Sequence, residues 1–155
     1  MNRNSSKKAF TLVEMLVVVA IIGMLASLIF GGLITSARAK ARDARRIADL
    51  ANIQSVLELY YSKFGFYPEP QTNWEDFTTI LTGPEIGIGI SKVPKEPLAS
   101  VGKTYYYGRS TDGQDYVLGA VLETKDPTLD DDFDGIIYGV DCGPAVGDMI
   151  YCIKP

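Results

Sequence analysis

The chain has 155 residues, of which 46% are hydrophobic and 22% charged. This length suits one domain, and the composition excludes disordered, collagen-like and multi-span membrane proteins. The net charge of −4 argues against a broad nucleic-acid-binding surface, and the absence of histidine excludes any mechanism that needs an imidazole base or ligand.

The first forty residues combine a basic start with a long apolar run. Arg3, Lys7 and Lys8 come first without any acidic neighbour, and residues 15–37 form an uncharged run of 23 that is rich in Leu, Ile, Val and Met. A helix of about 20 such residues spans the hydrocarbon core of a bilayer, and a basic flank tends to stay in the cytoplasm. The sequence therefore predicts a transmembrane helix, with residues beyond about 38 facing outward.

Two simpler interpretations of this run remain open at this point. A cleaved secretory signal has an apolar core of about 7–15 residues, which is shorter than the run seen here. A plain signal anchor requires nothing beyond the run itself. Neither accounts for Glu14, the only ionisable side chain between residues 9 and 37. A carboxylate in an apolar membrane helix is costly, and it therefore indicates a function.

Residues 7–14, Lys-Lys-Ala-Phe-Thr-Leu-Val-Glu, and the apolar run after them resemble the class III signal of type IV pilins and type II secretion pseudopilins. The resemblance implies that a prepilin peptidase cleaves after Ala9 and methylates the new N-terminal Phe10. Glu14 then stands at the fifth position of the mature chain, where the family has its glutamate. The family usually has glycine in place of Ala9. Further implied partners are membrane lipid, minor pilins or pseudopilins, and an inner-membrane assembly platform with its ATPase.

The implied role of Glu14 agrees with elementary electrostatics. In a helical filament, the free amine of Phe10 on a neighbouring subunit would neutralise the buried carboxylate. A buried ion pair is preferred to an unpaired buried charge by several kcal/mol. We therefore expect Glu14 to set the register between subunits and to draw each subunit from lipid into the filament.

The helix is predicted to continue as an amphipathic segment to about residue 63. Its apolar side chains recur at steps of three and four residues: Ile47, Leu50, Ile53, Leu57, Tyr60 and Phe64. Five basic residues crowd just past the predicted membrane: Arg38, Lys40, Arg42, Arg45 and Arg46. We interpret them as a solvated helix face; contact with lipid phosphates, with acidic faces of adjacent subunits or with DNA are the alternatives.

The remaining sequence predicts a small head. Gly65 and Pro68 end the long helix, and a short helix follows around Trp74 to Leu81 with Asn73 as its N-cap. Short strands are predicted at residues 104–108, 116–123, 136–140 and 149–153, with a turn at 111–113. Because these strands follow one another closely, the sheet is expected to be antiparallel.

The predicted fold class is therefore α+β and pilin-like. A long N-terminal α-helix, with its first half transmembrane, packs on a small antiparallel β-sheet head. The expected organisation is a cleaved leader at 1–9, a transmembrane or filament-core half at 10–37, an amphipathic half at 38–64 and a globular head at 65–155.

An acidic segment near the C-terminus suggests a cation site. Residues 125–141 hold six aspartates, and their spacing matches D-x-D-x-D-G with a further acid at the twelfth position of a calcium loop. The flanks read as strands, so the loop is EF-hand-like without being an EF-hand. The predicted Ca²⁺ ligands are Asp130, Asp132, Asp134, the backbone carbonyl of Ile136, and Asp141. The alternative is an acidic surface loop that serves solubility. Major pseudopilins carry a calcium site in this part of the head, so the resemblance supports its position.

The two cysteines, Cys142 and Cys152, predict a structural disulfide. They lie ten residues apart on the outward side, where thiols become oxidised. A redox motif would require C-x-x-C, and a zinc site would require more ligands. Closing a loop of this length stabilises the fold by about 2–3 kcal/mol. A disulfide that closes a C-terminal loop is also common in type IV pilins.

The sequence contains no histidine-based nucleophile–base pair and no phosphate-binding loop, so we expect a structural protein and not an enzyme. The resemblance implies a subunit that polymerises into a type IV pilus or a type II secretion pseudopilus, for protein secretion, adhesion, motility or DNA uptake. It also implies a bacterial inner-membrane location followed by a periplasmic or surface filament. The acidic loop favours a pseudopilin, whereas the disulfide favours a type IV pilin. The rival interpretation is a membrane-anchored extracellular calcium-binding module that never polymerises.

Overall fold

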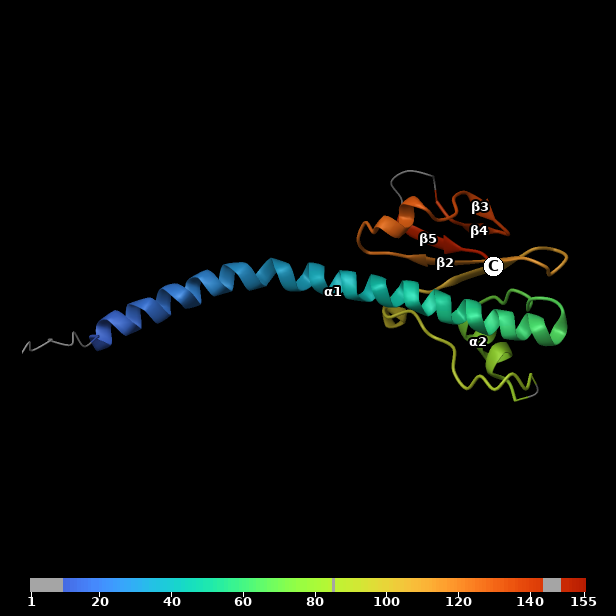
Figure 1. Cartoon of the computed structure of the whole chain (residues 1–155), viewed down its shortest axis with the longest axis horizontal. Helices are drawn as coiled ribbons and strands as arrows, with labels where there is room; N and C mark the ends of the chain where they lie inside the picture. The colour runs from blue at the N-terminus through green and yellow to red at the C-terminus, as the bar shows by residue number, and fades with distance from the viewer. Residues whose placement is uncertain (1–9, 85, 144–148) are drawn as a thin grey trace, which may run out of the picture. The chain divides into compact units, whose positions relative to one another are not determined.

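The computed structural model describes residues 10–84, 86–143 and 149–155, except for the side chains of residues 28–33. The chain divides into two compact units, Met1–Arg38 and Ala39–Pro155, and each is described by itself. The longest element is α1 (Leu12–Phe64), an α-helix of 53 residues that passes from the first unit into the second (Figure 1). The predicted helix from residue 10 to about 63 is confirmed.

Helix α1 begins and ends at local signals that are visible in the sequence. At its start, the backbone N–H of Glu14 donates to the hydroxyl of Thr11 (3.2 Å), which acts as an N-cap. At its end, Gly65 adopts a φ of 76° and donates its backbone N–H to the carbonyl of Tyr61 (2.7 Å). A left-handed residue after the last turn is a common helix stop, and glycine adopts it without a clash.

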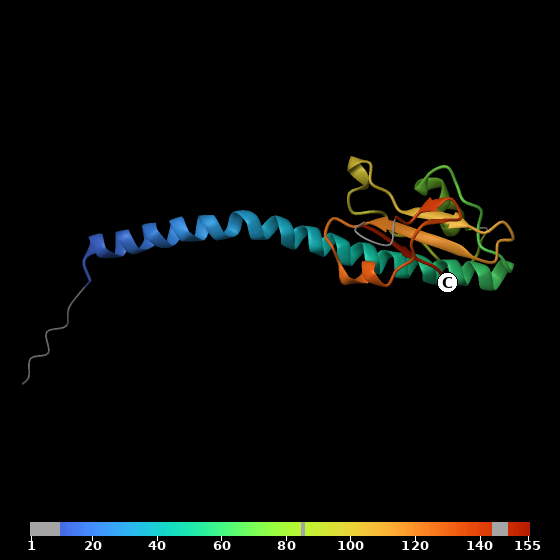
Figure 2. The ribbon, with the colours of Figure 1, turned by 90° about the horizontal axis from the view of Figure 1, so that it is seen from above.

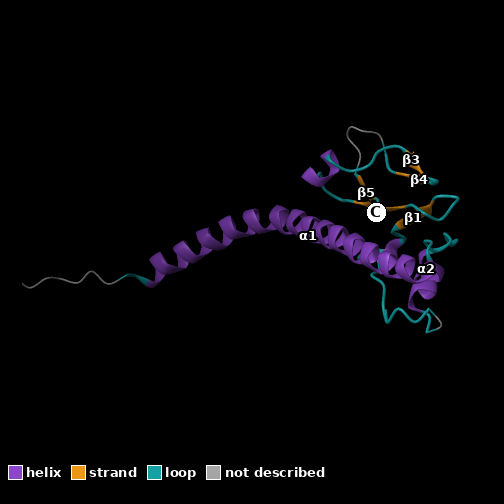
Figure 3. Ribbon diagram, turned by 45° about the vertical axis from the view of Figure 1, so that its right-hand side comes forward, coloured by secondary structure: helices purple, strands orange, loops and turns teal. Residues whose placement is uncertain are grey.

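The head contains a three-stranded antiparallel sheet in the order β1 (Tyr106–Arg109), β2 (Tyr116–Val121) and β5 (Ile150–Ile153). Figure 3 shows the strands together with the short helix α2 (Trp74–Thr82). As predicted, the side chain of Asn73 caps α2 by accepting the backbone N–H of Asp76 (2.9 Å). Two single-turn 3₁₀ helices, η1 (Ala99–Val101) and η2 (Pro127–Asp130), lie in the connections. The antiparallel head confirms the predicted fold class.

One strand prediction was wrong. Residues 136–140 form a hairpin of two very short strands, β3 (Ile136–Ile137) and β4 (Val140–Asp141), instead of one strand. The residues between them, Tyr138 and Gly139, have φ values of 47° and 83°. Two successive positive φ values reverse the chain in the two-residue turn that suits a hairpin. The sequence signal was weak because tyrosine rarely adopts a positive φ.

The core of the head has two layers on either side of β2. One face packs against the predicted apolar stripe of α1, at Leu50, Ile53 and Leu57, all of which are fully buried. The other face packs through Val117 against the β3–β4 hairpin and the cysteines. Figures 1 and 2 show the sheet alongside the part of α1 that belongs to the head. Burial on both faces explains why β2 is almost continuously apolar.

Candidate functional site

Where the structure describes it, the helix surface of the first unit is largely apolar and exposed. Among the described residues 10–27 and 34–38, every side chain except that of Ala26 is exposed, including Leu12 (80%) and Met24 (71%). Apolar surface in water costs about 25 cal/mol per Å², so this unit requires lipid or protein as a cover. Within the described part of the chain, no helix is sufficiently long and apolar to traverse a membrane. The membrane span at 10–37 stays a prediction.

The residues implied in processing and assembly lie at the start of this surface. Ala9 lies outside the described residues. Phe10 is 70% exposed, and Glu14 is exposed two residues after α1 begins. Within the described residues, the carboxylate of Glu14 has no ion-pair partner.

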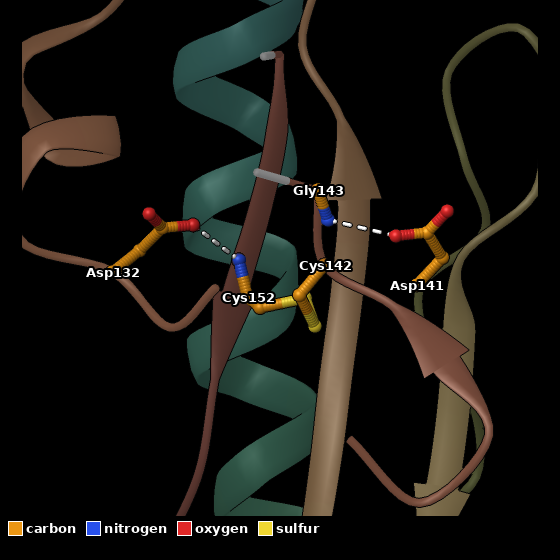
Figure 4. Close-up of a disulfide and its surroundings, with 5 residues drawn as sticks. All are labelled: Asp132, Asp141, Cys142, Gly143 and Cys152. Atoms are coloured by element: carbon orange, nitrogen blue, oxygen red, sulfur yellow. Dashed lines mark hydrogen bonds between the residues drawn. A yellow bond between two sulfur atoms is a disulfide. The ribbon is translucent and has the colours of Figure 1, made fainter. Parts of the chain in front are cut away.

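The structure does not bring the predicted calcium ligands together. The backbone N–H of Cys152 donates to Asp132 (2.8 Å), and the backbone N–H of Gly143 donates to Asp141 (3.0 Å). Figure 4 shows these two carboxylates on opposite sides of the disulfide, each bound to a different backbone group. No group of three acidic or other metal-ligating side chains gathers in the described part of the chain. The described geometry does not fit the ion, and calcium binding stays a prediction.

The disulfide between Cys142 and Cys152 is present and fully buried (Figure 4). It joins the end of β4 to β5, with the two Cα atoms 5.8 Å apart. Gly119 of β2 lies beneath it, and a Cβ at this position would lie only 3.2 Å from the sulfur of Cys152. The disulfide therefore fastens the hairpin to the edge strand β5, close against the central strand β2.

A polar cluster fastens the same hairpin from its other end. The ammonium of Lys154 contacts Asp115 (2.8 Å) and lies over the rings of Phe133 (5.7 Å) and Tyr138 (5.5 Å). The hydroxyl of Tyr138 also donates to Asp115. Partial burial by itself raises the pKa of Asp115, but the bonds from Lys154 and Tyr138 outweigh it, so the net shift is downward. The last residues of the chain thus hold the turn of the hairpin.

A buried ion network anchors the head to α1. Arg46 is fully buried, and its guanidinium binds three carboxylates: Asp43 (2.7 Å), Glu123 (2.7 Å) and Glu96. Asp43 in turn accepts the backbone N–H groups of Glu123 (2.9 Å) and Thr124 (2.8 Å). These bonds join α1 to the end of β2 and to the loop before η1.

This network corrects the interpretation of the basic cluster. Arg46 is neither solvated nor available to lipid, to another subunit or to DNA, and Arg42 is bound by Glu123 of the same chain. The sequence did contain a signal, because Asp43 and Arg46 continue the apolar stripe of Leu50 at steps of three and four. Charged residues at stripe positions indicate a buried ion pair when acids elsewhere in the fold can reach them.

The network also shifts the pKa values of Glu123 and Arg46. The bond from Arg42, together with those from Arg46, lowers the pKa of Glu123 to about 2 against the desolvation that raises it. For Arg46, burial alone would lower the pKa, but the bonds to Glu123, Glu96 and Asp43 outweigh it and raise the pKa. Both groups are therefore charged at any physiological pH.

A long N-terminal helix on a small antiparallel head, following the Lys-Lys-Ala-Phe-Thr-Leu-Val-Glu signal, defines a pilin-like protein. In agreement, residues 4–30 match the family model of the prokaryotic N-terminal methylation motif. No solved structure gives a significant match.

Three curated relatives are each called type II secretion system core protein G. The Vibrio cholerae protein is 30% identical over 112 residues, which cover 69% of this chain and 74% of the relative. Those of Escherichia coli and Klebsiella michiganensis are 28% and 31% identical, and the matches cover 63% and 56% of their lengths. The chain therefore belongs to the family of pilins and pseudopilins that includes type II secretion system core protein G.

Proposed function

We propose that the chain is a structural subunit of a type II secretion pseudopilus. The observation that carries this proposal is the methylation motif at residues 4–30 on a chain whose relatives are type II secretion core proteins. The exposed apolar surface of residues 10–25 supports it, since that surface needs sister helices or lipid as a cover. The disulfide alone favoured a type IV pilus, but the relatives favour the pseudopilus.

In this proposal, a prepilin peptidase removes residues 1–9 and methylates Phe10. The subunit waits in the inner membrane with its head outward. An assembly platform and its ATPase then draw it into a periplasmic filament together with minor pseudopilins. Glu14 finds its counter-charge in the amine of Phe10 on a neighbour, because no described residue of its own chain neutralises it.

Mass spectrometry of the N-terminus, on full-length chain expressed in its own host, tests this proposal. The expected product begins at a methylated Phe10. A chain that keeps Met1 would contradict the proposal and would favour the non-polymerising anchored module. A mature chain that starts elsewhere would point to an ordinary signal peptidase.

A further inference from the structure

Two cavities of the head lie side by side next to the start of α2. Their volumes are about 510 Å³ and about 370 Å³, and both fall in the range of ~300–1,000 Å³ that is typical of small-molecule sites. Asn73, Trp74 and Thr104 line both cavities, so the two share a wall. We call the two cavities together the α2 groove.

The shared wall contains Trp74, the only tryptophan of the chain. Its indole N–H donates to the carbonyl of Pro94 (3.1 Å), and its ring packs against those of Phe77 (5.1 Å) and Tyr105 (5.5 Å between centroids). Trp74 is only partly buried, so these contacts leave part of its surface accessible. A ring that is already held in place can receive the apolar face of a ligand at little cost in ordering.

The described residues that line the smaller cavity include no charged side chain. They comprise five aromatic residues and four with amide or hydroxyl groups, namely Trp74, Phe77, Tyr105, Tyr106 and Tyr107 together with Gln71, Thr72, Asn73 and Thr104. Residues 65–155 carry 15 acidic and 6 basic side chains, so an uncharged lining contrasts with the rest of the head. Aromatic rings beside amides and hydroxyls suit a ligand that is neutral, polar and partly apolar.

The charges that line the larger cavity balance one another. Glu75 and Asp76 are matched in number by Lys95 and Lys103, and the ammonium of Lys95 contacts Glu75 (2.5 Å). The remaining acid of the lining, Glu96, is buried and bound by Arg46, as described above. An anion or a cation would therefore meet no net opposite charge here, which again favours a neutral ligand.

We propose that the α2 groove binds a neutral oligosaccharide. A sugar ring has an apolar face of C–H groups, which packs on an aromatic ring, and a rim of hydroxyls that donate and accept hydrogen bonds. Trp74 supplies the ring, and the cavities beside it hold successive sugar units.

The polar groups of the shared wall have bonding capacity left for these hydroxyls. The amide of Asn73 donates one hydrogen bond to the carboxylate of Asp76 (2.8 Å) and accepts one from its backbone N–H (2.9 Å), which leaves one N–H and one lone pair. The hydroxyl of Thr104 donates to the carbonyl of Tyr105 (3.1 Å) and keeps its lone pairs. This binding activity goes beyond the pseudopilus function and does not depend on it.

Intrinsic fluorescence tests the groove directly, because Trp74 is the only tryptophan and its emission reports on this site. Full-length chain is kept in a detergent without a sugar headgroup, which would otherwise compete. The probes are three neutral tetrasaccharides (chitotetraose, cellotetraose and maltotetraose), the anionic tetragalacturonate and an end-capped tetrapeptide of serine and tyrosine. At least one neutral tetrasaccharide is expected to change the emission saturably below about 10 mM, and the anionic sugar and the peptide are expected to bind at least about tenfold more weakly.

Variants compared by titration calorimetry place the binding in the groove. Trp74→Ala is expected to weaken binding at least about tenfold through loss of the ring, and Thr104→Val about fivefold through loss of one hydroxyl. Thr79→Val is the matched control for Thr104→Val and is expected to bind like the wild type, because Thr79 is exposed on α2 and lines neither cavity.

Melting curves check that each variant is folded, and Thr104→Val decides the question if Trp74→Ala is not. The proposal is overturned if no neutral tetrasaccharide gives a saturable change, or if Thr104→Val binds as tightly as Thr79→Val. It is equally overturned if tetragalacturonate or the peptide binds as tightly as the neutral sugars. Filament formation enters none of these measurements, so their failure leaves the pseudopilus function standing.

Discussion

The stem, residues 10–38, and the head, residues 39–155, differ in whether their charged side chains have partners within the described chain. In the stem, Glu14 has no ion-pair partner among the described residues and lies within exposed apolar surface. In the head, Arg46 is buried with three carboxylates of its own chain. The head therefore pairs its buried charge internally, whereas the described part of the stem leaves the charge of Glu14 without an ion-pair partner. This difference is what a polymer-forming subunit requires.

The strongest test of the comparison removes the stem carboxylate. Glu14→Val is expected to leave the stability of the head unchanged, because Glu14 belongs to the other compact unit of the chain, but to abolish filaments or N-methylation through loss of the proposed intersubunit pair. Filament yield and N-terminal mass are the measurements, and Glu14→Asp, which keeps the charge, serves as the control. Normal filaments and full methylation in Glu14→Val would show that neither assembly nor methylation needs the charge of Glu14, and would contradict the expected intersubunit pair.

Removing the buried charge of Arg46 in the head should instead lower the free energy of unfolding. Arg46→Met leaves Asp43, Glu96 and Glu123 without their shared cation and is expected to cost about 3–5 kcal/mol in the free energy of unfolding. Arg45→Met is the control, since Arg45 is largely exposed one residue away, and it is expected to cost under about 0.5 kcal/mol. Urea unfolding monitored by circular dichroism measures both. Equal losses in the two variants would show that the buried network does not anchor the head.

The disulfide is the next most important interaction within the head. Replacing Cys142 and Cys152 together by serine is expected to destabilise the head by about 2–3 kcal/mol, because the reduced chain regains the entropy of the open loop. Reductant should lower the melting temperature of the wild type to about that of the double variant. It should leave the melting temperature of the double variant unchanged. A wild type that is insensitive to reductant after unfolding and refolding would contradict this expectation.

The sequence predicted those parts of the molecule whose causes are local. The predicted end of α1 and start of α2 depend on Gly65 and Asn73, each within four residues of its partner. The Thr11 cap of α1 is equally local, although the sequence analysis did not predict it. The stripe of α1 depends on helical periodicity alone, and the disulfide depends on there being only two cysteines. These features needed no knowledge of the tertiary fold.

What the sequence did not predict depends on contacts between distant segments. Glu96 and Glu123 meet Arg46 from 50 and 77 residues away, so the basic cluster looked like a solvated face. Asp132 is bound by a backbone N–H that lies 20 residues further on, a competitor for its carboxylate that spacing alone cannot reveal. Spacing identified the acidic segment but not what its side chains bind.

The ion network predicts how the head responds to acid. The pKa of Glu123 is about 2 in the folded state against an ordinary 4.5, so its contribution is complete above about pH 4.5 and is lost as the pH falls toward 2. Because its side chain is a quarter exposed, we expect about 2 kcal/mol of stability from this group. Urea unfolding at several pH values measures the slope, which should flatten in Glu123→Gln. Glu75→Gln, an exposed carboxylate elsewhere, should keep the wild-type slope.

The smallest expected effect concerns calcium, and it tests whether the head needs a bound ion for its full stability. If the acidic loop binds calcium, the ion should raise the melting temperature by the equivalent of about 1 kcal/mol when its concentration is about five times Kd. Asp132→Ala should abolish the gain, whereas Asp131→Ala, which removes a charge from the same loop at a residue not predicted as a ligand, should keep it. Asp132→Ala should also lower the baseline by about 1 kcal/mol, since the N–H of Cys152 loses its acceptor. Identical wild-type melting curves with calcium and with chelator would refute calcium binding. The loop would then be held by the disulfide, by Lys154 and by the backbone hydrogen bonds alone.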